Sequence, residues 1–100
     1  MIVVRMVFQA KFGKASEVVA TFKRGQERIH EIIGDRARAR FLTDLSGPFD
    51  TVVQEVEVES LAEWERIRAR LFTDPRFREM QASGPGLLEG GRTEYYTVES

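Results

Sequence analysis

Cysteine and asparagine are absent from this 100-residue chain, and histidine occurs once. Without cysteine the chain forms no disulfide, carries no thiol nucleophile and offers no cysteine ligand to a metal. One histidine cannot supply the two imidazoles of a common transition-metal site, so we expect no metal. The glycine motifs of phosphate-binding loops, dinucleotide-binding folds and serine hydrolases are also missing. These absences exclude most enzyme classes that a single sequence can reveal, and whether the protein is an enzyme stays open.

Charge and hydropathy exclude two further kinds of partner. The chain carries 15 basic and 16 acidic side chains, a net charge of −1, and both signs are spread along its length. We therefore expect no nucleic-acid partner. No apolar run approaches the roughly 20 residues that cross a bilayer. The N-terminal segment Met1–Arg5 lacks the pattern of a signal peptide. We expect no membrane partner, a cytoplasmic location and one domain over residues 1–100.

Alternating hydrophobicity predicts four strands, separated in the chain by helical patterns and turns. The strands are expected at residues 2–10, 36–45, 49–59 and 92–98. A loop rich in glycine is expected at residues 83–91, before the last strand. The order of elements is then a strand, a helix and a strand, followed by the same three elements again.

Helices are predicted by apolar residues that recur at steps of three and four. The first is expected at residues 14–33 and is ended by Gly34, although its N-terminal cap is not clear from the sequence. Ser60 opens the second helix and forms a capping box with Glu63. The dipeptide Asp74-Pro75 caps and begins a short further helix.

Two β-α-β units of this length predict an α+β fold of the ferredoxin-like βαββαβ type. The expected sheet has four antiparallel strands, with the two main helices on one face. Right-handed crossovers place the first and third strands side by side at its centre. The opposite face of the sheet then has no helix to cover it.

The helix-free face mixes apolar and charged side chains, which is typical of a symmetric interface, and we predict a homodimer packed sheet against sheet. The residues expected on this face are Val3, Arg5, Val7, Arg38, Arg40, Leu42, Val53, Glu55 and Tyr95. Several valines in water would be a real loss, because each buried valine is worth about 1.5 to 2 kcal/mol. A plain solvated face is the alternative.

A ligand cleft between helices and sheet is a second hypothesis. Gln26 interrupts the apolar stripe of the first helix, and Arg68 lies at the edge of the stripe of the second. A buried polar group without a partner costs about 1 to 3 kcal/mol, so something must satisfy these groups. One interpretation is a cleft with Phe22 and Trp64 as apolar walls and Gln26 and Arg68 as polar tips. The other is a hydrogen bond between helices, with the arginine reaching solvent.

His30 and Tyr95 are the weak candidates for a catalytic group. His30 is the one side chain that titrates near neutral pH by default, and it lies at the border of the first helix's apolar stripe. Tyr95 and Tyr96 point to opposite faces of the last strand. One of them is therefore expected in the cleft and the other in the dimer interface.

Six short segments carry a family resemblance that spans nearly the whole chain. They are Phe12-Gly13-Lys14, Gly47-Pro48-Phe49, Thr51–Glu57, Ser60–Glu65, Thr73–Phe77 and Glu94-Tyr95-Tyr96. With these segments the chain resembles the dimeric α/β-barrel superfamily and, within it, small NIPSNAP-like proteins. The resemblance implies that two sheets close into an α/β barrel, and it implies no settled activity.

The resemblance also implies an alternative function. The superfamily includes cofactor-independent monooxygenases of quinone-like aromatic substrates, in which His30 or Tyr95 would take a proton. It includes haem-degrading monooxygenases as well, which use an asparagine, a tryptophan and a histidine in one cleft. Because this chain has no asparagine, we expect no haem and no other cofactor.

Overall fold

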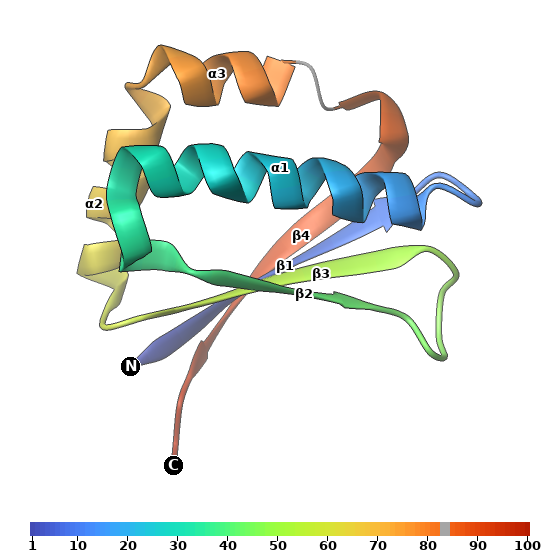
Figure 1. Ribbon diagram of the computed structural model, residues 1–100. Helices are drawn as coiled ribbons and strands as arrows, with labels where there is room; N and C mark the ends of the chain where they lie inside the picture. Colours follow the sequence, from blue (N-terminus) through green and yellow to red (C-terminus); the bar gives the residue numbers. More distant parts are fainter. Residues whose placement is uncertain (83–84) are drawn as a thin grey trace.

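The computed structural model describes residues 1–82 and 85–100. Its elements are β1 (Ile2–Ala10), α1 (Ala15–Ile33), the 3-10 turn η1 (Gly34–Ala37), β2 (Ala39–Thr43), β3 (Thr51–Val58), α2 (Leu61–Phe72), α3 (Pro75–Ala82), the 3-10 turn η2 (Pro85–Leu87) and β4 (Leu88–Thr97). The four strands form one antiparallel sheet in the order β2-β3-β1-β4. Figure 1 shows α1, α2 and α3 on the same side of this sheet. The predicted ferredoxin-like fold, with β1 and β3 at the centre, is confirmed.

The N-terminus of α1 is capped from a distant loop. Lys14 stands at the cap position and its side chain makes no capping hydrogen bond. Instead the carboxylate of Asp50, which lies just before β3, accepts hydrogen bonds from the backbone N–H groups of Gly13 (2.9 Å) and Ala15 (3.2 Å). At the other end α1 stops at Gly34, whose φ of 66° is a conformation that glycine adopts without strain.

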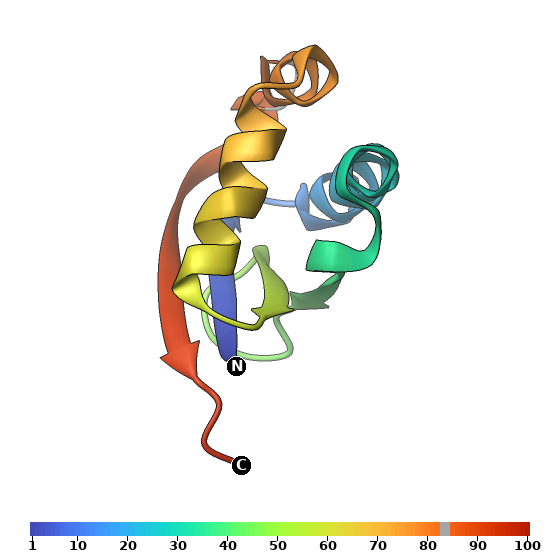
Figure 2. The same ribbon diagram turned by 90° about the vertical axis from the view of Figure 1, so that its left-hand side faces the viewer.

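The predicted N-terminal caps of α2 and α3 are present, but the Glu63 carboxylate of the predicted capping box pairs with Arg36 and Arg66 instead. The Ser60 hydroxyl accepts a hydrogen bond from the Glu63 N–H at 3.1 Å. Asp74 Oδ1 accepts one from the Arg76 N–H at 2.9 Å, and its carboxylate also pairs with the Arg76 guanidinium. Figure 2 shows α2 beside α1 and leading into α3 at the top of the view.

Two predicted boundaries are wrong. The alternation at residues 36–45 predicts a strand, but residues 34–37 form η1, which buries Ala37 in the core, and β2 begins at Ala39. At the C-terminal strand, Gly90 and Gly91 of the expected loop lie within β4, which begins at Leu88. A Cβ at Gly91 would lie 3.0 Å from the Val7 carbonyl oxygen, so close approach to β1 explains this glycine. Residues 83 and 84 of the predicted loop lie outside the described residues.

The apolar core divides into two clusters on the helix side of the sheet. The larger cluster includes Val4 and Val56 beneath Trp64 and Ile67 of α2. The smaller one joins the far ends of β1 and β3 to the first turns of α1 through Val18. This division leaves the middle of the sheet's helix side without a fully packed cover.

The helix-free face differs in part from the prediction. Register places Val3, Arg5 and Val7 of β1 on it, together with Arg40 and Leu42 of β2, Val53 and Glu55 of β3, and Tyr96 of β4. The prediction for Tyr95 was wrong, because its register partner is the core residue Val4. Arg38 precedes β2 and is not part of the strand.

The two central valines of this face are already covered in a single chain. Val7 is 7% exposed and Val53 is 6% exposed, so the expectation that both lie in water is wrong. Each is the other's cross-strand neighbour, and Arg92 lies opposite Val7 on β4. Long side chains such as arginine cover apolar neighbours with their aliphatic stems. The exposed apolar surface of the face is instead at Leu42 and Tyr96.

Charged side chains cross the helix-free face as one chain of ion pairs within the protomer. Arg40 pairs with Glu55 at 2.6 Å, and Glu55 also pairs with Arg5. Arg5 reaches Glu94 at 3.4 Å, and Glu94 pairs with Arg92 at 2.7 Å. The hydrogen bonds from Arg40 lower the pKa of the Glu55 carboxyl, and Arg5 adds to the effect. These charges are therefore paired within one chain, without a partner subunit.

Candidate functional site

A cleft of about 470 Å³ lies between the sheet, α1 and the α2–α3 pair. Its floor comes from neighbouring strands, and its walls come from the three helices. The floor residues are Met6, Phe8, Gln54, Val56, Thr93 and Tyr95. The principal wall residues are Phe22, Gln26, Ile29, Trp64, Arg68, Leu71, Phe72, Phe77 and Met80. The volume falls in the range of small-molecule sites, which is about 300–1,000 Å³.

The walls of the cleft are largely apolar and aromatic. Phe22 contacts Phe8 edge to face, with ring centroids 4.9 Å apart. On the opposite side Phe72 and Phe77 make a perpendicular contact at 5.3 Å. Aromatic side chains in edge-to-face pairs form stiff walls, because their rings hold each other in orientation. The cleft therefore presents mainly apolar and aromatic surface to a ligand.

Two buried polar atoms of opposite hydrogen-bonding character belong to lining residues. Trp64 is 8% exposed, and its indole N–H finds no acceptor among the described residues. Gln26 donates its amide N–H to the Ala37 carbonyl oxygen at 3.3 Å, but its Oε1 finds no donor there. The residues that line the site therefore include one unpaired donor and one unpaired acceptor, both on buried atoms.

Arg68 lies at the rim of the cleft and is 43% exposed. Its guanidinium carbon is 5.7 Å from the centroid of the Phe72 ring, in a cation–π arrangement. Its Nη1 is 3.3 Å from the carboxylate of Glu65, one turn away on α2. The stacked ring and the helix keep the charge of Arg68 at the mouth of the cleft.

The structure brings together five of the residues singled out from the sequence. Phe22, Gln26, Trp64, Arg68 and Tyr95 line the same cleft, although they come from α1, α2 and β4. Tyr95 is half-exposed on the floor, opposite Val4. The inward stripes of the two helices converge over the sheet, which is why residues far apart in the chain meet.

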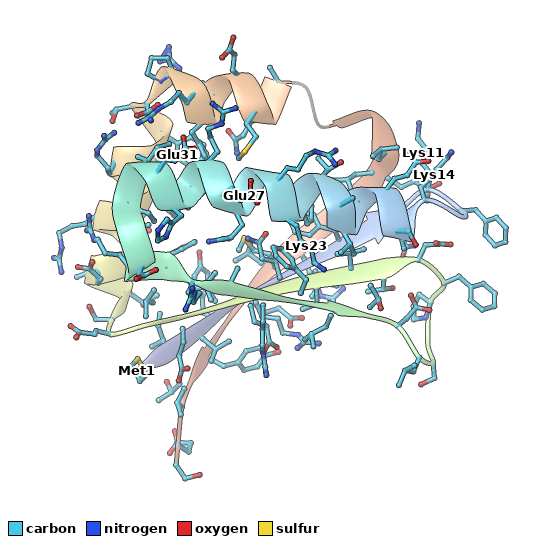
Figure 3. All side chains as sticks on the ribbon, in the orientation of Figure 1. Met1, Lys11, Lys14, Lys23, Glu27 and Glu31 are labelled. Atoms are coloured by element: carbon cyan, nitrogen blue, oxygen red, sulfur yellow. The ribbon has the colours of Figure 1, made fainter. Side chains whose placement is uncertain are left out.

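His30 lies outside this cleft. It lines a separate surface groove of about 450 Å³ beside α1. Figure 3 labels Lys23, Glu27 and Glu31, which line the same groove along α1. The imidazole is 57% exposed, and its Nδ1 is 3.2 Å from Asp35. The structure therefore does not place His30 where it could act on a ligand in the cleft.

Gly25 of α1 lies against Met80 of α3. A Cβ at Gly25 would lie 2.9 Å from the sulfur of Met80, so the missing side chain allows α3 to approach α1. Met80 in turn lines the cleft. Gly25 therefore serves the packing of α3 that closes one wall, rather than the ligand directly.

Four polar residues of the site were missed in the sequence, namely Thr21, Gln54, Gln81 and Thr93. Gln54 and Thr93 are cross-strand neighbours of Met6, so they form one row across the floor. Gln81 of α3 lines the cleft as well. A signal existed for Gln54, because alternation places it between the buried residues Val52 and Val56 of β3. Nothing comparable pointed to Thr93 or Gln81, whose positions depend on the path of β4 and α3.

The chemistry available in the cleft is limited. Among the described residues, no aspartate, glutamate or histidine lines it. No group of three or more such side chains in the described part of the chain could hold a metal ion. None of the described helices has both the length and the apolar character needed to cross a membrane.

Comparison with solved structures identifies the fold. No family model and no curated protein matches the sequence. An uncharacterized NIPSNAP domain protein from Burkholderia xenovorans superposes with a TM-score of 0.87 and 22% identity, covering 100% of this chain and 96% of that one. A NIPSNAP family protein from Agrobacterium tumefaciens gives 0.80 and 20%, covering 96% and 90%. The chain has the fold of the NIPSNAP domain proteins.

This NIPSNAP-type fold is shared with proteins of another description. A putative antibiotic biosynthesis monooxygenase from Nitrosomonas europaea superposes with a TM-score of 0.73 and 11% identity, over the whole of both chains. The resemblance inferred from the sequence is thus confirmed, at identities that speak for the fold alone. Any ligand or activity has to be argued from the cleft itself.

Proposed function

We propose that the protein binds a small apolar or aromatic ligand in the cleft between its helices and sheet. The unpaired indole N–H of Trp64, together with the unpaired Oε1 of Gln26, carries this proposal. Each buried unsatisfied group costs about 1 to 3 kcal/mol, which a sealed core would have avoided with apolar residues. A ligand that accepts from one and donates to the other recovers that cost on binding.

The test uses 2-naphthol, a flat aromatic molecule whose hydroxyl is both donor and acceptor. Because Trp64 is the one tryptophan in the chain, its indole N–H gives a single cross-peak in a ¹H–¹⁵N NMR spectrum of labelled protein. We expect this cross-peak to move during titration, with a Kd on the order of 0.1 mM for a ligand of this size. An unmoved cross-peak at saturating 2-naphthol would refute the proposal.

Two variants distinguish binding in the cleft from non-specific binding elsewhere on the protein. Trp64→Phe keeps an aromatic wall and removes the donor, and we expect calorimetry to show 2-naphthol binding weakened about fivefold. Phe12 is a large exposed aromatic residue that does not line the cleft. Phe12→Leu should leave the affinity unchanged. Equal losses in both variants would show that the probe binds elsewhere.

We also propose that the protein is a homodimer, joined through the helix-free faces of the two sheets. Leu42 and Tyr96 expose apolar surface on this face, next to ion pairs that are already satisfied within each chain. Such a face can be buried without leaving a charge unpaired, which avoids the large cost of an uncompensated buried charge. Two sheets closing in this way form the α/β barrel.

Light scattering at micromolar concentration tests the dimer. We expect a particle of twice the 11.5 kDa of one chain. Leu42→Glu places a charge in the proposed interface and should shift the particle toward one chain. Leu61 is more exposed than Leu42 but lies at the start of α2, away from that face. Leu61→Glu should leave the mass unchanged, and a wild type that is monomeric under these conditions refutes the dimer.

A second candidate function is cofactor-independent oxygenation of a quinone-like aromatic substrate. The fold shared with two proteins described as antibiotic biosynthesis monooxygenases favours it. With His30 outside the cleft, Tyr95 on the floor is the remaining candidate for accepting a proton from the substrate. The reaction converts 1,4-dihydroxynaphthalene and O₂ into 2-hydroxy-1,4-naphthoquinone and water, and the substrate supplies all the electrons.

Oxygen uptake with this hydroquinone decides between binder and enzyme. An oxygenase forms the hydroxyquinone without hydrogen peroxide, at a rate above that of heat-denatured protein. Tyr95→Phe should then slow turnover at least tenfold while binding of 2-naphthol persists. If the wild-type protein gives no turnover above the background reaction, the oxygenase function is excluded and binding alone remains.

A further inference from the structure

We infer that the natural ligand of the cleft is an amphipathic anion, an apolar and aromatic-sized body that carries one carboxylate held by Arg68. This inference rests on the proposed ligand binding and adds the charge and the orientation of the ligand. The buried end of the ligand meets Gln26 and Trp64, and the charged end lies at the rim.

The charge that lines the described part of the cleft has one sign, which is positive. Among the described residues, Arg68 is the one charged side chain that lines it, and every other lining residue is neutral. An apolar wall on the inner side concentrates the field of a single charge at the mouth of a cleft. A ligand with a positive charge is therefore disfavoured, and a negative charge is favoured without competition from acidic residues inside the cleft.

The ion pair of Arg68 is weak enough to be exchanged. Glu65 touches it through one contact at 3.3 Å, and both side chains are exposed, so the pair is stabilised little in water. The neighbouring pair is different, because the Arg66 guanidinium binds Glu63 through two nitrogens at 3.0 and 2.7 Å. A ligand carboxylate at the rim can form a bidentate pair with Arg68, which Glu65 does not form.

The Phe72 ring positions the Arg68 guanidinium for binding a carboxylate. The Phe72 ring lies beneath its guanidinium at 5.7 Å, and Phe72 itself is part of the cleft wall. A guanidinium stacked on an aromatic ring keeps its edge free for hydrogen bonds in its own plane. The same ring therefore contacts the apolar body of a ligand on the inner side and fixes the cation that would bind its carboxylate.

A matched pair of probes tests the charge. We measure the Kd of 2-naphthoate and of 2-naphthamide by calorimetry at neutral pH, since the two share one ring system and differ in charge. We expect wild-type protein to bind 2-naphthoate about tenfold more tightly. Arg68→Gln should remove most of this preference, and Arg68→Lys should retain part of it, because lysine keeps the charge without the paired donors. Arg66→Gln is the control, since Arg66 does not line the cleft.

The outcomes distinguish this inference from the function on which it rests. If naphthoate and naphthamide bind equally, or if Arg68→Gln weakens both alike, the anionic ligand is refuted while ligand binding stands. If neither probe binds or moves the Trp64 cross-peak, the proposed function fails as well. A ¹H–¹⁵N spectrum with the chemical-shift dispersion of the wild type verifies that each variant is folded, so a loss of affinity cannot be mistaken for a loss of structure.

Discussion

Replacing Gln26 with methionine tests directly whether the cleft contains an unsatisfied acceptor. Methionine has nearly the length of glutamine and a similar helix propensity, so the change removes the amide with little effect on α1. We expect Gln26→Met to stabilise the free protein and to weaken the binding of ligands that donate a hydrogen bond. If Gln26 served only stability, its replacement would destabilise the free protein instead.

The expected change in the free energy of unfolding has two contributions, one from the Oε1 and one from the N–H of the Gln26 amide. Removing the buried Oε1, which has no donor among the described residues, recovers about 1 to 3 kcal/mol. Losing the 3.3 Å hydrogen bond to the Ala37 carbonyl oxygen costs about 1 kcal/mol. The net gain is about 1 kcal/mol in the free energy of unfolding, or about 4 to 8 °C in Tm for a domain of this size.

Thermal and urea unfolding of the free protein measure this gain. Gln81→Met is the matched control, because Gln81 is an exposed glutamine on the rim, and it should change stability by less than about 0.5 kcal/mol. In the binding assay, Gln26→Met should lose affinity for 2-naphthol but not for 2-methoxynaphthalene, which has no donor. A Gln26→Met protein that is less stable by 1 kcal/mol or more would refute the reasoning, since the amide would then have another partner in solution.

Three further predictions concern the scaffold that shapes the cleft. Ile67→Ala should destabilise the protein by about 2 to 5 kcal/mol in urea unfolding, because this side chain is fully buried; a loss below 1 kcal/mol would contradict the packing. Asp50→Ala should cost about 1 to 2 kcal/mol, since the Ala15 N–H loses its acceptor and alanine must adopt a φ of 60°. Asp50→Gly should cost less by the same measurement, and equal losses would deny the backbone contribution. Hydrogen bonds from Arg76 lower the pKa of Asp74 in the folded state, so the native protein binds fewer protons there. Stability from Asp74 is then complete above the ordinary aspartate pKa of about 4 and is lost as the pH falls below it, and Asp74→Asn should flatten this part of the curve of Tm against pH.

The composition of the cleft was predictable because helix periodicity reports which residues share a face. Gln26 follows Phe22 by one turn and Arg68 follows Trp64 by one turn, so each polar residue had to lie beside an apolar one. The pairing of the two helices over one sheet face followed from the βαββαβ order. Whether the helices and the sheet would form a cleft or a sealed core was not predictable, because this depends on how closely the helices approach each other.

Other parts of the site depended on contacts between distant segments. His30 lies at the border of a helical stripe, and only the position of η1 decides that it faces a groove with Asp35 instead of the cleft. The cap of α1 comes from Asp50, 35 residues beyond the N–H of Ala15 that it binds, and no local motif indicates such a partner. The burial of Val7 depends on cross-strand neighbours in the same way.

The amino-acid sequence by itself determined the order of strands and helices, the pairing of two β-α-β units and the residues that face the core. These features depend on side-chain periodicity and on chain connectivity, which are local properties of the chain. Only the tertiary structure decided that the core divides into two clusters with a cleft between them, and that Trp64 and Gln26 keep unpaired polar atoms there. The physical reason is that packing and hydrogen-bond satisfaction are properties of the spaces between elements, and those spaces exist only once the elements meet.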